Sequence, residues 1–251
     1  MNHTIICHRG IDRHDENTYK SITDITTLDD DGNVQYGVEF DVQITNDNQI
    51  ICYHDDTLLR LHHCDKKVCD ITIEDIDKYN LPYFSDVMKK LSSKKNILVD
   101  VEIKVYNPIS IQKIQLLCQN VINICVAEKM IPQCIFTAFD DNVIHELVTI
   151  NNITPIKIGK IIYEDYNLQD FEYLKNLGVK ALILHKNMVV KALDDYKELL
   201  SGIDLYVYTL FCINEKDNDY DIDDEFVTSI KGKNIGLITD DYKKVLNLIS
   251  H

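Results

Sequence analysis

The chain has 251 residues, of which 45% are hydrophobic and only 8 are Gly and 4 Pro, so it is long enough for one large globular domain. Its 41 acidic residues outnumber its 26 Lys and Arg residues, and the net charge of -15 disfavours contact with nucleic-acid phosphates or anionic membrane surfaces. Since no apolar run is long enough to span a bilayer, we expect no nucleic-acid partner and no stable membrane insertion.

Short β-rich apolar runs alternate along the chain with segments of helical period, a pattern typical of βα units around a parallel sheet. The expected strands cover residues 4–9, 37–44, 50–54, 97–104, 133–139, 155–162, 180–185, 204–210 and 235–239. The clearest expected helices cover residues 17–28, 108–128, 140–150, 168–177 and 189–200.

Two of these strands lie too close together to be parallel neighbours, because only "TNDNQ" separates residues 37–44 from residues 50–54. A parallel crossover needs roughly a dozen residues, so the two runs are predicted to form an antiparallel hairpin with its turn near Asp47. Facing positions then have numbers that sum to about 94. The remaining eight strands predict an α/β fold, a (β/α)8 TIM barrel, as a single domain over residues 1–251.

Residues 56–96 are too many for a simple loop and contain helical runs on either side of Pro82. We expect a small insertion at the barrel mouth, after the second barrel strand, followed by one barrel helix. The Asp-rich run "DDDGN" at 29–33 is expected to be a solvated loop.

The eight cysteines favour buried, reduced thiols over disulfides, because several lie in apolar strand-like runs and no secretion signal precedes them. "HHCDKKVC" at 62–69 contains zinc-type ligands, but its spacing matches no strong template, and a solvated loop is the favoured interpretation. The first expected strand begins within the first few residues and leaves no room for a presequence, so the cytoplasm is the expected location.

Charged residues recur on one face of two expected strands, because side chains two residues apart on a strand share a face. Glu39 and Asp41 share a face of one strand, and Asp100, Glu102 and Lys104 share a face of another. When the apolar neighbours pack outward against helices, these charged side chains point into the barrel.

Buried carboxylates that converge need positive charge among them. Arg9 and Lys104 supply part of that charge. Three carboxylates, those of Glu39, Asp41 and Glu102, also suit one hard divalent cation, Mg²⁺ or Ca²⁺. Zinc is disfavoured because neither a thiolate nor a histidine cluster joins them.

Two histidines reach the same end of the barrel. His8 ends the first expected strand, and the hairpin register places His54 opposite Phe40, near Glu39 and Asp41. Two histidines beside a metal site are suited to general acid and base catalysis near neutral pH, although the sequence does not say which is which. Each alone also fits a structural role, and it is their combination that predicts metal-assisted phosphoryl transfer.

An ordered series of motifs resembles the glycerophosphodiester phosphodiesterase (GDPD) family. The motifs are "HRG" (8–10), "ENT" (16–18), "EFD" (39–41), "TNDNQIICYHD" (45–55), "DITIEDI" (70–76), "LPYFSDV" (81–87), "VEIK" (101–104), "TAF" (137–139), "YVYTL" (206–210) and "ITDD" (238–241). They span almost the whole chain, and their order is specific where each alone is weak. The resemblance implies a TIM barrel with a small inserted segment.

Carried over by position, the resemblance implies metal ligands at Glu39, Asp41 and Glu102, acid and base histidines at His8 and His54, phosphate contacts at Arg9 and Lys104, and supporting residues at Glu16 and Asn17. The chain departs from the family pattern at Asp15, where Pro is usual, at "LPYF", and at Tyr208, where Trp is common. Tyr208 is expected to line the substrate pocket, so the departure leaves the shape of the substrate open.

The resemblance implies a metal-dependent phosphodiesterase that converts a small-molecule glycerophosphodiester into glycerol 3-phosphate and an alcohol. One alternative is a lysophospholipase D-like or sphingolipid phosphodiesterase of the same barrel superfamily. Another is a non-catalytic relative that binds a metal or a phosphate ligand. The head group, the preferred cation, the attacking group and the oligomeric state stay open.

Overall fold

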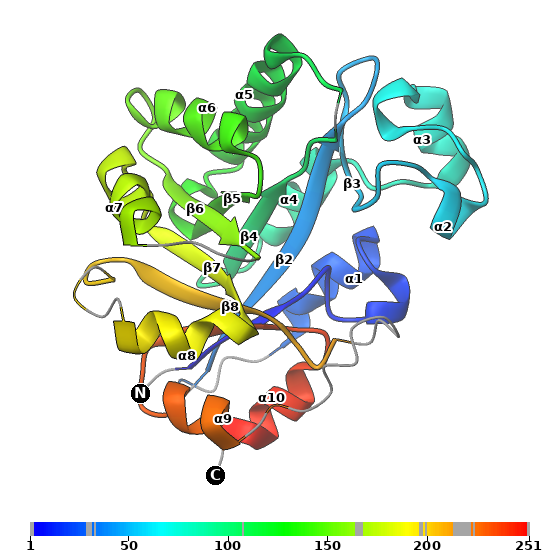
Figure 1. Ribbon diagram of the computed structural model, residues 1–251. Helices are drawn as coiled ribbons and strands as arrows, with labels where there is room; N and C mark the ends of the chain where they lie inside the picture. The colour runs from blue at the N-terminus through cyan, green and yellow to red at the C-terminus, as the bar shows by residue number, and fades with distance from the viewer. Residues whose placement is uncertain are drawn as a thin grey trace.

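The computed structural model describes residues 3–28, 32, 34–106, 108–163, 168–195, 198, 200–212, 222 and 224–249. Its strands are β1 (His3–Cys7), β2 (Val34–Ile44), β3 (Ile50–Cys52), β4 (Leu98–Ile103), β5 (Cys134–Ala138), β6 (Lys157–Ile162), β7 (Ala181–His185), β8 (Asp204–Leu210) and β9 (Ile235–Thr239). All pair parallel except β3, and β1 pairs with both β2 and β9 (Figure 1). The predicted (β/α)8 TIM barrel is confirmed.

The helices lie outside this barrel (Figure 1). They are α1 (Tyr19–Thr23), α2 (Leu59–His62), α3 (Ile73–Tyr79), α4 (Phe84–Leu91), α5 (Ile111–Ala127), α6 (Asp141–Asn151), α7 (Leu168–Leu177), α8 (Lys186–Asp195), α9 (Asp224–Ile230) and α10 (Tyr242–Ile249). The predicted ends of residues 108–128, 140–150 and 168–177 lie close to those of α5, α6 and α7. The expected loop at 29–33 and the end of the expected helix 189–200 fall largely outside the described residues.

The helix expected over residues 17–28 is much shorter in the structure. Only α1 is α-helical, and a 3₁₀ turn, Asp24–Thr27, follows it directly. The hydroxyl groups of Thr23, Thr26 and Thr27 each donate to a backbone carbonyl three or four residues earlier. Such side-chain bonds compete with the helical ladder, which explains why the helical pattern did not extend the helix.

The hairpin has the predicted register, since Val42 pairs with Cys52 and Ile44 with Ile50, two pairs whose numbers sum to 94. Its return strand is shorter than expected and ends at Cys52. The first barrel strand also ends early, at Cys7. The two histidines therefore lie just beyond strand ends, at the carboxyl face of the barrel, where TIM-barrel active sites lie.

The insertion after β3 has a small core of its own, made by Ile51, Tyr53, Leu58, Val68, Ile71, Ile76 and Leu81. The helix α4 instead packs on the barrel, because Phe84, Val87, Met88 and Leu91 are buried in the main core. In Figure 1 the insertion, with α2 and α3, stands beside the barrel near β3. The insertion thus packs around a cluster of its own, whereas α4 packs with the barrel.

The barrel interior is filled beneath its mouth. Ile6, Ile135 and Ile183 are buried there with Tyr206, whose ring occupies the space where a side chain at position 236 would lie. A Cβ atom at Gly236 would come within 2.2 Å of that ring. Because these described side chains fill the lower barrel, the space for a ligand lies toward the carboxyl face.

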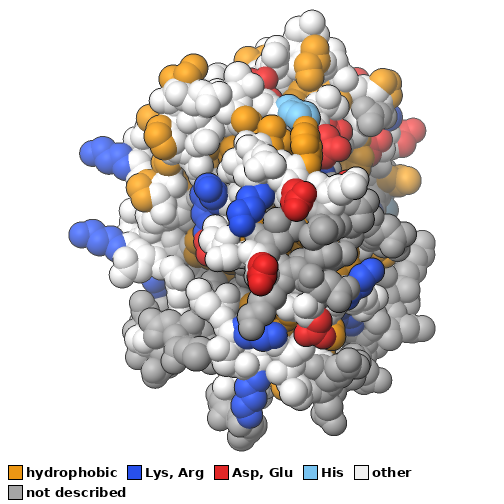
Figure 2. Space-filling model, turned by 60° about the vertical axis from the view of Figure 1, so that its left-hand side comes forward, with side chains coloured by type: hydrophobic (Ala, Val, Ile, Leu, Met, Phe, Trp, Pro, Cys, Tyr) orange, Lys and Arg blue, Asp and Glu red, His pale blue; other side chains and the backbone are white. Residues whose placement is uncertain are grey.

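The surface and the cysteines also bear on the sequence-based expectations. Within the described part of the chain, none of the helices combines the length and apolar character that crossing a membrane requires. The face shown in Figure 2 carries hydrophobic side chains in small groups between charged ones of both signs.

All eight cysteines are free thiols. In "HHCDKKVC", His62 packs against the rings of Tyr53 and Tyr79.

Candidate active site

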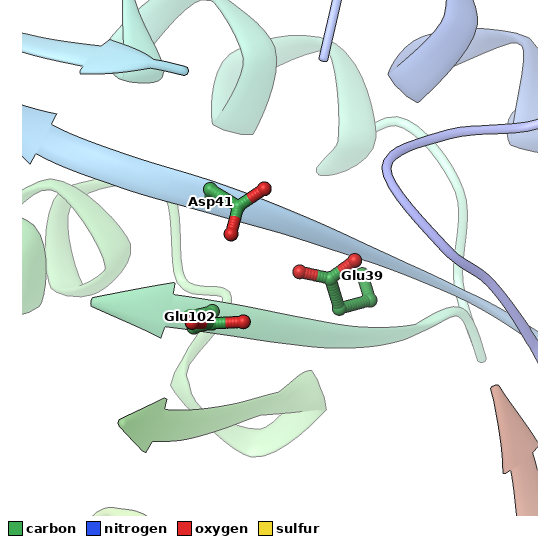
Figure 3. A group of neighbouring side chains, drawn as sticks. All are labelled: Glu39, Asp41 and Glu102. Carbon is green, nitrogen blue, oxygen red and sulfur yellow. The ribbon is translucent and has the colours of Figure 1, made fainter. Parts of the chain in front are cut away.

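Three carboxylates meet at the carboxyl ends of two neighbouring strands. Glu39 and Asp41 lie on β2 and Glu102 lies on β4, where the parallel register sets Asp41 beside Glu102 (Figure 3). One oxygen atom of each carboxylate lies within 4.8 Å of the others, and all three residues are buried. Among the described residues this is the group of metal-ligand type, and "HHCDKKVC" forms none.

Two cations lie against this cluster. The Lys104 ammonium donates to Glu102 Oε1 at 2.5 Å and lies 3.2 Å from Asp41 Oδ1. The Arg9 guanidinium lies 3.5 Å from Asp41 Oδ2, and the Arg9 backbone N–H donates to Glu39 Oε2 at 2.9 Å. Arg9 and Lys104 thus partly compensate the buried negative charge of the three carboxylates.

The loop after β1 holds Arg9 in an unusual backbone conformation. Arg9 has φ of 55° and Gly10 has φ of 106°. A Cβ atom at Gly10 would come within 2.3 Å of Ser21 Oγ, so only glycine lets the loop pack this closely on α1. The loop therefore directs the Arg9 backbone N–H at the carboxylate cluster.

Glu16 and Asn17 support the site from the next turn of the same loop. The Asn17 amide donates to Asp41 Oδ2 at 2.8 Å and accepts from the Asp41 backbone N–H at 3.2 Å. Glu16 accepts from Arg9 Nη1 at 3.1 Å. Both residues are buried, so they restrict the positions that Asp41 and Arg9 can take.

His8 is held by a carboxylate from the far end of the chain. Its Nδ1 atom lies 2.7 Å from Oδ1 of Asp240, the residue that follows β9, and its Nε2 atom lies 3.9 Å from Glu39 Oε2. The other Asp240 oxygen forms an ion pair with Arg13, and the Asp240 carboxylate is fully buried. An Asp240 carboxylate accepts a hydrogen bond from Nδ1–H, and in that tautomer the Nε2 lone pair faces the site.

His54 has a similar arrangement built from the insertion. Its Nδ1 atom lies 2.7 Å from Asp55 Oδ1, and Arg60 on α2 donates to Asp55 Oδ2 at 2.6 Å. Arg60 also donates to Glu16, and the Tyr106 hydroxyl donates to the His54 carbonyl at 2.5 Å. One arginine thus joins the segment that carries His54 to the loop that carries Arg9.

The charges at the site alter the proton affinities of its groups. Burial and the neighbouring Asp41 and Glu102 raise the pKa of Glu39 well above its ordinary value. Burial would also raise the pKa of Asp41, but the Lys104, His54 and Arg9 charges outweigh it and hold that pKa below its ordinary value. Burial and the Arg9 charge lower the pKa of His8. His8 therefore favours its neutral form.

The residues present fit a divalent cation. Among the described residues, the buried Glu39 Oε1 has no hydrogen-bond partner, and the buried Asp41 Oδ1 makes no hydrogen bond and has only an ion-pair contact with Lys104 at 3.2 Å. A buried carboxylate oxygen without a partner costs free energy, and a cation bound there would satisfy both atoms. The oxygen-only donor set suits Mg²⁺ or Ca²⁺ better than zinc.

A cavity of about 230 Å³ opens over these groups. Its charged side contains His8, Arg9, Glu39, His54, Glu102 and Lys104. The other side is apolar and aromatic, and it includes Phe139, Tyr163 and Tyr208. The seven residues expected to contribute to catalysis, metal binding or phosphate binding, and the expected supporting residues Glu16 and Asn17, therefore lie in or directly behind one cavity, together with Tyr208.

Asp240, Arg13, Asp55 and Arg60 also contact the site, although sequence reasoning assigned them no role. Asp240 and Asp55 belong to the motifs "ITDD" and "YHD", and each directly follows a strand end or a site histidine. Testing every residue after a barrel strand would have found Asp240. The insertion offered no such signal for Arg60.

Comparison with known proteins gives consistent matches over the whole chain. The model of the glycerophosphoryl diester phosphodiesterase family matches residues 8–244. A glycerophosphodiester phosphodiesterase of Caldanaerobacter subterraneus subsp. tengcongensis is 25% identical over 273 aligned residues, covering 99% of this chain and 98% of that protein.

Solved structures share the fold. A glycerophosphodiester phosphodiesterase from Parabacteroides distasonis superposes with a TM-score of 0.76 at 20% identity, covering 99% of this chain and 98% of that one. An Oleispira antarctica phosphodiesterase in complex with the product sn-glycerol-3-phosphate superposes with a TM-score of 0.74 at 17% identity, covering 99% and 97%.

Proposed function

The chain belongs to the glycerophosphoryl diester phosphodiesterase family, and on that basis we propose that it hydrolyses glycerophosphodiesters to glycerol 3-phosphate and an alcohol. The observation that carries the proposal is the pair of histidines, His8 and His54, each oriented by its own carboxylate beside three converging carboxylates. Two similar proteins support it: a relative named glycerophosphodiester phosphodiesterase, and a structural neighbour solved with the product sn-glycerol-3-phosphate.

We assign the cofactor role to one divalent cation, Mg²⁺ or Ca²⁺, held by Glu39, Asp41 and Glu102. When bound, it would polarise a non-bridging phosphate oxygen. Arg9 and Lys104 lie beside the same carboxylates and would neutralise the charge that develops on the phosphoryl group.

The two histidines divide the proton transfers. His8 acts as the base, because burial and Arg9 favour its neutral form and Asp240 leaves its Nε2 atom ready to accept a proton. It takes the proton from the attacking hydroxyl as the new P–O bond forms. Attack by water gives glycerol 3-phosphate directly, whereas attack by the adjacent glycerol hydroxyl gives a cyclic phosphate that water then opens. His54 donates its proton to the leaving alcohol oxygen as the old P–O bond breaks, and the hydrogen bond between its Nδ1 atom and Asp55 orients the ring.

The alternatives have less support. The cavity of about 230 Å³ is smaller than the roughly 300–1,000 Å³ of sites for drug-sized ligands, so a small diester fits it better than a lysophospholipid. A non-catalytic relative needs neither oriented histidine. The eight free thiols fit a reducing compartment, so we propose the cytoplasm as the location.

Product release tests this function. We would measure glycerol 3-phosphate and free alcohol from glycerophosphocholine and glycerophosphoethanolamine, and free choline from lysophosphatidylcholine, with Mg²⁺, Ca²⁺ or EDTA. Wild type should cleave the two small diesters only with metal, and His54→Ala should lower kcat by about 10²–10⁴-fold.

The matched control is His145→Ala, which removes a histidine on α6 that packs against Tyr173 away from the cavity. It should keep wild-type activity. Metal-independent cleavage, or an active His54→Ala variant, would contradict the mechanism. Preferred cleavage of lysophosphatidylcholine would favour the lysophospholipase D-like alternative instead. Ligand binding without any product would favour the non-catalytic one.

A further inference from the structure

The aromatic side of the cavity has a structure of its own. Phe139 follows β5, Tyr163 follows β6 and Tyr208 lies on β8, so these rings come from the half of the barrel that faces the charged strands. Ile161 and Ile183 complete the apolar surface between them. A phosphodiester bound to the charged side would therefore direct one of its two alcohol groups at this wall.

The rings form a connected series in which neighbours stand at steep angles. Phe139 and Tyr208 have centroids 6.2 Å apart at 83°, and Tyr208 and His185 have centroids 5.6 Å apart at 78°. His185 then contacts Tyr163 at 5.0 Å and 56°. Rings arranged in this way form the sides of a box. Their edge-to-face and tilted contacts with one another restrict their orientation without a ligand.

The wall offers π surface and few polar groups. Phe139 has no polar side-chain atom, and the Tyr208 hydroxyl donates to the Ile162 carbonyl at 3.3 Å. A primary ammonium or a polyol would lose hydrogen bonds to water here and gain few in return. A quaternary ammonium has no N–H to satisfy, and the faces of aromatic rings attract it.

The protein already places a cation on this wall. The Lys104 ammonium lies 5.6 Å from the centroid of the Phe139 ring, while Glu102 and Asp41 compensate its charge. The site thus tolerates positive charge at the aromatic surface, next to the expected phosphate position.

We propose that Phe139, Tyr163 and Tyr208 form a subsite for a quaternary ammonium group, so that the preferred leaving alcohol is choline-like. The inference rests on the proposed function, since it takes a phosphodiester on the charged side as its starting point. It goes further by selecting the head group, which the chain's family does not specify. Cation–π attraction, rather than apolar contact alone, provides the preference.

The kinetic test compares two diesters that differ by three methyl groups. Wild type should show kcat/KM for glycerophosphocholine about tenfold above that for glycerophosphoethanolamine. Tyr163→Leu should reduce this ratio to near one, and Tyr163→Phe should retain it, because phenylalanine keeps the ring. Tyr173→Leu is the matched control, because Tyr173 on α7 is 52% exposed, as Tyr163 is, but lies outside the cavity lining.

A binding test separates charge from apolar contact without turnover. Choline and its neutral isostere 3,3-dimethylbutan-1-ol would be titrated into the full-length protein and followed by calorimetry. Choline should bind about tenfold more tightly in wild type and in Tyr163→Phe, and this difference should disappear in Tyr163→Leu.

Equal binding of the two alcohols, or a choline to ethanolamine ratio near one in wild type, would overturn the inference and leave the phosphodiesterase intact. A ratio unchanged by Tyr163→Leu, with preference for lysophosphatidylcholine, would assign the wall to an acyl chain instead. Failure to cleave any diester would overturn the proposed function, and the binding test would still decide whether the wall holds a cation.

Discussion

Asp240 contacts His8 in the same way as Asp55 contacts His54, through the Nδ1 atom of the ring. One of its oxygen atoms lies 2.7 Å from His8 Nδ1, and the other pairs with Arg13. Both oxygen atoms of this fully buried carboxylate therefore have a partner. Arg13 pairs with the carboxylate, and a carboxylate that accepts a hydrogen bond from His8 Nδ1–H selects the tautomer in which His8 carries its proton on Nδ1. In the proposed mechanism Asp240 would act through His8, as a positioning residue.

Replacing Asp240 by Asn should test this role. An Asn side chain can turn its amide N–H₂ toward His8 Nδ1, which moves the imidazole proton to Nε2 and removes the lone pair that accepts the proton. We expect kcat/KM on glycerophosphocholine to fall on the order of 10³-fold, with KM nearly unchanged. Steady-state kinetics over pH 5–9 would measure it.

Asp241→Asn is the control, because Asp241 is the next residue and has a side chain 33% exposed. It should retain wild-type kinetics. If Asp240→Asn only lowers the melting temperature and keeps kcat/KM at every pH, Asp240 has a purely structural role.

At the level of the elements, strand alternation and hairpin register were predictable because both follow from a period of two. They sufficed to bring Glu39, Asp41 and Glu102 together and to place His54 near them. Contacts made by Arg60 were not predictable, because α2 has a single turn and its direction depends on the packing of the insertion. The threonine-rich segment after α1 shows the same limit, since local side-chain bonds decided where the helix ends.

Arg60 should make stability depend on pH through its two carboxylate partners. Burial would raise the pKa of Glu16 and of Asp55, but hydrogen bonds from Arg60, and from His54 to Asp55, outweigh it and lower both pKa values. The unfolded chain therefore binds these protons first as the pH falls. The stabilisation is complete above about pH 5 and is lost at lower pH.

Arg60→Met removes the charge and keeps an apolar stem. Because Arg60 is 46% exposed, solvent limits its contribution, and we expect the variant to lose about 1 kcal/mol of unfolding free energy at pH 7. The loss should be smaller at pH 3 than at pH 7, as measured by urea unfolding. Lys67→Met, at a 42% exposed ion pair in the same insertion, is the control. A loss equal at both pH values would mean that Arg60 stabilises by packing alone.

The whole barrel is needed to assemble the site, since Asp240 and His8 stand 232 positions apart and meet only when β9 pairs with β1. Barrel closure also encloses like charges. Three buried carboxylates share two cations, and Glu39 Oε1 has no hydrogen-bond partner among the described residues, so the metal-free fold carries a free-energy cost that a bound cation would remove. Metal binding should therefore stabilise the molecule as well as activate it.

At a concentration 100 times the dissociation constant, a bound cation adds about 2.7 kcal/mol to the free energy of unfolding. For a chain of this length, that corresponds to a rise in melting temperature of roughly 5–10 °C in Mg²⁺ or Ca²⁺ over EDTA. Glu102→Gln should abolish the rise, because it removes a ligand. Glu172→Gln, an exposed change on α7, should keep it. Because the chain has a net charge of -15, cations could also bind weakly elsewhere on its surface. Such binding would raise the melting temperature of wild type, Glu102→Gln and Glu172→Gln equally. That result would refute a single metal site at the carboxylate cluster.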